Sequence, residues 1–85
     1  MGMDKYEKAI RSIEIQLEDT DYNTGYVSGL VAMVSEHIAG LVSMAEKFRC
    51  TTLGEASSSE ATRLAVKLVS TLSKHKDFEG LKQYE

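Results

Sequence analysis

The sequence predicts an all-α fold, a three-helix bundle with a long central helical hairpin. Apolar residues recur at the helical period along the whole chain, and the chain contains neither proline nor tryptophan. Its 85 residues suffice for one domain, which we place at 1–85. A domain of this size buries only about 60–65% of its unfolded surface, so we expect further copies of the chain to complete its core in an oligomer.

The first helix is expected at about residues 4–17. Its apolar side chains recur at 4-3-4 spacing and form one stripe, which consists of Tyr6, Ile10, Ile13 and Leu17. Asp4 precedes this stripe and can accept hydrogen bonds from the free N–H groups of the first turn. The following segment, EDTDYNTG, favours turns because its short polar side chains bond to the neighbouring backbone.

The second helix is expected at about residues 24–49, with Thr24 as its N-cap residue. One half of its surface is large and apolar, and consists of Val27, Leu30, Val31, Val34, Ile38, Leu41, Met44, Ala45 and Phe48. The other half is almost entirely small, and consists of Ser28, Gly29, Ala32, Ser35, Glu36, Ala39, Gly40 and Ser43. Because a small monomer covers only one side of a central helix, the small half predicts the close approach of another helix, from a second copy of the chain.

The third helix is expected at about residues 58–74. We interpret TTLGEASSSE as the break before it, because Ser57 and Glu60 have the spacing of a capping box. The core face of this helix is expected to consist of Ala61, Leu64, Ala65, Leu68 and Leu72. A short last turn is expected at 77–84. Short connections between the second and third helices make them antiparallel neighbours.

Composition excludes several partners and compartments. A formal net charge of −3 argues against general binding to DNA or RNA. The N-terminus has no apolar signal region and the chain has one cysteine, so we expect a cytoplasmic protein. A membrane-spanning helix at 25–45 is disfavoured because Glu36 would lie near the bilayer centre, at a cost of about 2.5–3.5 kcal/mol.

The sequence predicts no enzyme, no metal site and no cofactor. Its single cysteine and two histidines have no ligand spacing. Glu36 and His37 diverge by about 100° on a helix, so they cannot act on one substrate atom. We interpret His37 as a structural or interface residue and Cys50 as an inert thiol. No serine lies in a nucleophile motif.

Two polar groups and the tyrosines suit an anionic, base-containing ligand. Hydroxyls at the expected start of the third helix would lie beside free N–H groups, and Arg63, Lys67 and Lys74 share one face of that helix. Tyrosine rings can stack on planar bases. Three alternatives remain open. The hydroxyls simply cap the helix, the cations lie on an ordinary solvated face where Glu60 pairs with one of them, or the tyrosines close the end of the core. The candidate ligand-binding residues are Tyr6, Tyr22, Thr24, Tyr26, Ser58, Thr62, Arg63 and Lys67.

The segments SSSEATRLAVKLVSTL and YNTGY resemble a family of small phage proteins that counter CBASS immunity by sequestering cyclic oligonucleotides. The resemblance implies a helical-hairpin homo-oligomer acting in the host cytoplasm. It implies that Arg63 and Thr24 correspond to the family's ligand-binding arginine and threonine, and Tyr6 to its stacking tyrosine. The family's lysine near the second helix has no counterpart, since Tyr22 occupies that position.

Two functions of different classes are therefore expected. The first is a non-catalytic sponge that binds cyclic di- or trinucleotides between subunits and assists immune evasion. The second is a small helical adaptor or inhibitor that docks on another protein through its apolar helix faces. A membrane-inserted phage protein is the remaining alternative.

Overall fold

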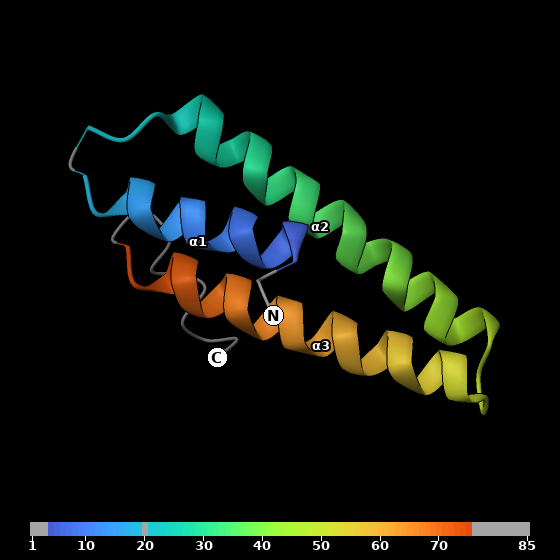
Figure 1. The fold of residues 1–85 in the computed structure, drawn as a ribbon. Coiled ribbons are helices and arrows are strands. Elements are labelled where there is room, and N and C mark those ends of the chain that lie inside the picture. Colours follow the sequence, from blue (N-terminus) through green and yellow to red (C-terminus); the bar gives the residue numbers. More distant parts are fainter. Residues whose placement is uncertain (1–3, 20, 76–85) are drawn as a thin grey trace.

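The computed structural model describes residues 4–19 and 21–75, which form three helices and no strand (Figure 1). These are α1 (Lys5–Leu17), α2 (Thr24–Lys47) and α3 (Thr52–Ser73). Helices α2 and α3 form a long antiparallel hairpin, and α1 lies along the half of it that contains the start of α2 (Figure 1). The predicted all-α three-helix bundle is thus confirmed. The turn expected at 77–84 lies outside the described residues.

Helix α1 forms as its sequence predicts. One carboxylate oxygen of Asp4, Oδ1, accepts hydrogen bonds from the N–H groups of Tyr6 at 2.9 Å and Glu7 at 2.8 Å. Asp4 is therefore the N-cap residue of α1. Ile10 and Ile13 of the apolar stripe are buried against the hairpin.

Helix α2 begins at the predicted residue but has a different cap. The side chain of Asn23 accepts a hydrogen bond from the N–H of Tyr26 at 2.9 Å, so Asn23 is the N-cap residue and Thr24 is the first helical residue. The helix ends at Lys47, two residues earlier than predicted, because Phe48 leaves the helical conformation. Cys50 then adopts a left-handed φ of 66°, which reverses the chain.

Helix α3 begins six residues earlier than predicted, and the capping box at Ser57 and Glu60 does not form. Thr51 is the N-cap residue, and its hydroxyl accepts a hydrogen bond from the N–H of Gly54 at 3.1 Å. The segment TTLGEASSSE is expected to break the chain because Ser57 and Glu60 have the spacing of a capping box. Ser57 is instead buried within the helix, where tertiary packing overrides propensity.

The core lies where the three helices meet, and it leaves much of α2 uncovered. Its most deeply buried apolar side chains are Ile13, Val27, Val34 and Leu64. All eight residues of the predicted small half of α2 are exposed. By length and composition α2 could cross a membrane, although a buried helix of a soluble protein meets the same criterion. Only 11% of its most apolar window is buried here.

Candidate functional site

The strongest concentration of charged side chains lies between the start of α1 and the middle of α3. The guanidinium of Arg63 contacts Glu7 (Nη1 to Oε1, 3.1 Å), Asp4 (Nη2 to Oδ2, 3.5 Å) and Glu60. The other carboxylate oxygen of Glu7 lies 3.3 Å from the ammonium of Lys67. We call these five residues the Arg63 cluster. Three carboxylates and two cations give it a formal charge of −1.

This arrangement changes the expectation for the cationic face of α3. The sequence suggests that Arg63 and Lys67 repel each other, that Glu60 pairs with one of them, and that an anion or an acidic partner would pair with both. In the structure, Glu7 from α1 contacts both cations. Its alignment with Arg63 could not be read from the sequence, because it depends on how α1 packs against a helix almost sixty positions later.

The electrostatics of the Arg63 cluster are consistent with these contacts. The backbone N–H of Glu7 holds the pKa of the Asp4 carboxyl below its usual value, and the charge of Arg63 acts in the same direction. The hydrogen bond to Glu60 raises the pKa of Arg63, which remains protonated. The Arg63 side chain is 37% exposed, so water and salt screen these pairs and they contribute orientation more than stability.

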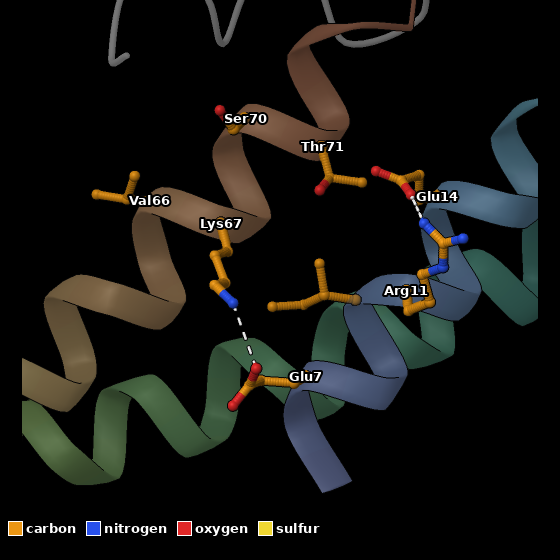
Figure 2. A pocket seen from close by; sticks show the side chains of 8 residues that line it. Glu7, Arg11, Glu14, Val66, Lys67, Ser70 and Thr71 are labelled. Atoms are coloured by element: carbon orange, nitrogen blue, oxygen red, sulfur yellow. Dashed lines mark hydrogen bonds and ion pairs between the residues drawn. The ribbon is translucent and has the colours of Figure 1, made fainter. Parts of the chain in front are cut away.

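A groove of about 320 Å³ adjoins the Arg63 cluster between α1 and α3. Figure 2 shows the Glu7–Lys67 pair at one end of this groove and the Arg11–Glu14 pair at the other. The apolar part of the groove is lined by Ile10 and by Val66, which is 61% exposed. The groove therefore offers balanced charges around a small apolar patch.

Tyr6 follows Asp4 and is half-buried. Its ring stacks on the ring of His37, with centroids 3.7 Å apart and planes 2° from parallel. One face of the predicted stacking tyrosine is thus occupied by a side chain of α2. The contact agrees with the interpretation of His37 as a structural residue.

A second group of candidate residues lies at the start of α2. The ring of Tyr22 packs edge-on against His75, with centroids 5.1 Å apart. Thr24 is exposed in the first turn, and Tyr26 is 48% exposed. This group is remote from Arg63, because His75 follows α3 and Arg63 precedes the last residue of α3 by ten positions, about 15 Å along the helix axis.

A third group lies near the turn between α2 and α3. Ser58 and Thr62 line a second groove of about 390 Å³ together with Arg49 and Cys50. Glu46 and Glu55 also line this groove, so its formal charge is −1. The helix-start anion site expected here does not form, because these hydroxyls lie beyond the first turn of α3, where N–H groups already bond within the helix.

Sequence reasoning missed Arg49 as a neighbour of Ser58 and Thr62. It also missed Asp4 and Glu7 as partners of Arg63. The one available signal for Arg49 was its position at the expected end of the second helix, which an antiparallel hairpin brings beside the start of the third. Among residues 4–19 and 21–75, no group of three or more His, Cys, Asp or Glu side chains is arranged to hold a metal ion.

Comparison with known proteins adds no relative. No protein-family model, curated protein sequence or solved structure matches the chain.

Proposed function

We propose that the protein is a non-catalytic binding protein that assembles with copies of itself and sequesters a cyclic oligonucleotide between subunits. It would act in the cytoplasm, that of the host if the protein is phage-encoded. The observation that carries this proposal is the uncovered face of α2, in which every residue of the small half is exposed. Binding without turnover is sufficient for sequestration.

The exposed face of α2 has the spacing of a helix-packing seam. Six exposed positions recur strictly four and three residues apart, at Ser28, Ala32, Ser35, Ala39, Val42 and Glu46. A repeat of this kind keeps one stripe facing a partner helix, and small side chains let the two backbones approach closely. The seam extends over most of a helix of 24 residues, which is about 36 Å long.

The separation of the candidate residues favours a ligand held between copies. Arg63, the Tyr22 end of the bundle and the Ser58 groove occupy three parts of one chain. A ligand that touches more than one of them must draw them from different subunits. Arg63 would form charge-assisted hydrogen bonds to phosphate, the hydroxyls of Thr24, Ser58 and Thr62 would add donors, and Tyr26 would stack on a base.

The test combines mass, bound nucleotide and affinity. Light scattering should give a multiple of the chain mass, and calorimetry with cyclic di-adenylate and cyclic tri-adenylate should detect binding of at least one of them. Arg63→Ala should weaken that binding by about ten- to a hundredfold. Arg11→Ala is the matched control, since Arg11 pairs only with Glu14 among the contacts described here, and it should bind normally. A monomer without binding heat would refute the proposal.

A second candidate function rests on a different observation. Met44 and Phe48 are four residues apart at the end of α2, so they share one face, and both are exposed, with exposed fractions of 38% and 36%. Such a patch suits a helical adaptor or inhibitor that docks on another protein. This function would take first place if the protein is monomeric and binds no cyclic oligonucleotide.

A further inference from the structure

Each terminal nitrogen of Arg63 contacts at least one carboxylate. Nη1 contacts Glu7, whereas Nη2 contacts Asp4 and Glu60. Glu7 holds Lys67 with its second oxygen. A phosphate that approaches these two cations therefore meets three carboxylates, which repel it. It can pair with both terminal nitrogens only by displacing a carboxylate from Nη2.

The three carboxylates differ in the helix that carries them. Glu60 lies on α3, three residues before Arg63, and moves with it. Asp4 and Glu7 belong to the N-cap and first turn of α1. Asp4 uses one oxygen to cap α1 and the other to contact Arg63, so the start of α1 is joined directly to α3.

We propose that Asp4 and Glu7 form an acidic latch, which occupies Arg63 and Lys67 in the free chain and must withdraw before an anionic ligand binds there. The inference rests on the proposed function, since it concerns the same arginine. It specifies that ligand binding at Arg63 is coupled to displacement of the first turn of α1 from α3.

Withdrawal of the latch would also uncover an aromatic ring. Tyr6 lies between the two latch residues, and its ring stacks on His37 of α2. A movement of the first turn of α1 away from the hairpin would separate the two rings. The cation that contacts phosphate and a second ring able to stack on a base, beside Tyr26, would then become available in a single step.

Neutral variants of the latch test this inference. Glu7→Gln keeps the side-chain shape but removes the charge that holds both cations, so pyrophosphate and cyclic tri-adenylate should bind more tightly by about fivefold. That factor corresponds to the repulsion of two unit charges about 4 Å apart in water. Asp4→Asn retains a capping oxygen and should act in the same direction. Glu18→Gln makes the same charge change at the exposed C-cap of α1, away from the Arg63 cluster and its groove, so it is the control and should have little effect.

Pyrophosphate separates failure of the latch from failure of the proposed function, because it carries phosphate without a base. Tighter pyrophosphate binding by Glu7→Gln supports the latch even if no cyclic oligonucleotide binds, and that result would overturn the proposed function alone. Equal or weaker pyrophosphate binding by Glu7→Gln, or no binding to any variant, would overturn the latch. Saturating ligand should also speed amide exchange at the start of α1 in the unmodified protein. Slower or unchanged exchange there would contradict the coupling.

Discussion

Replacing Gly54 by alanine should destabilise the bundle, although alanine is the better helix former. An added Cβ at this position would lie 2.3 Å from the carbonyl oxygen of Phe48 and 2.9 Å from its carbonyl carbon. Both atoms belong to the backbone of the turn, so neither can rotate away. Overpacking of this kind costs about 1–3 kcal/mol, and a backbone neighbour places Gly54→Ala toward the upper end.

The helix preference for alanine offsets only about 1 kcal/mol of that cost, which leaves a net loss of about 2 kcal/mol. For a domain of this size the melting temperature should fall by about 8–16 °C, as measured by far-ultraviolet circular dichroism. Gly29→Ala is the matched control. A Cβ at Gly29 would meet no described atom within 4 Å, so this variant should gain about 0.4–1 kcal/mol. Equal melting temperatures for Gly54→Ala and the unmodified protein would refute the close approach at this turn.

Three further predictions follow from particular contacts. Ile13 is fully buried, so Ile13→Ala should lower the free energy of unfolding, measured by urea denaturation, by about 2–5 kcal/mol, and Ile13→Val by about 0.5–1.5 kcal/mol. Similar losses for both variants would contradict the packing. The pKa of Asp4 in the folded state lies below its usual value of 3.8, so ionised Asp4 stabilises the fold above that pH, and this contribution is lost as the pH falls through the folded-state pKa. Asp4→Asn should therefore reduce the loss of unfolding free energy at acid pH. Gly40→Leu should reduce the mass measured by light scattering without changing helix content, because Gly40 lies on the open face of α2; an unchanged mass would exclude this face from assembly.

Local sequence signals predicted α1 and the start of α2 well because they act within a few residues. The carboxylate of Asp4 caps α1 as predicted, by reaching N–H groups two and three positions away. At the start of α2 the amide of Asn23 is the cap in place of the predicted Thr24. The start of α3 was mispredicted because Ser57 and Glu60 have the spacing of a capping box, whereas Ser57 is buried inside a helix that Thr51 caps. The turn itself depends on Gly54 and on the left-handed conformation of Cys50, a conformation uncommon for residues other than glycine.

The candidate site was predicted less completely, because its contacts join distant parts of the chain. Glu7 and Lys67 are 60 positions apart, and their meeting depends on the rotation of α1 about its own axis against α3. The sequence identified Arg63 and Lys67 as a cationic pair. It could not show that carboxylates of α1 already contact them, nor that Tyr22, Tyr26 and Ser58 lie apart from Arg63 in one chain.

Because α1 lies along only one half of the α2–α3 hairpin, the two ends of the hairpin should differ in their resistance to proteolysis. Beyond Val34, α2 has no fully buried residue, and the facing part of α3 contributes the small residues Gly54, Ser57 and Ala61. Few apolar contacts favour local opening, and Lys47 and Arg49 are exposed beside the turn. Trypsin should therefore cut preferentially at these two residues and leave α1 and the whole of α2 on one fragment. A partner that covers this end would slow the cut, so the rate of nicking reports occupancy of the α2–α3 turn without any knowledge of what occupies it.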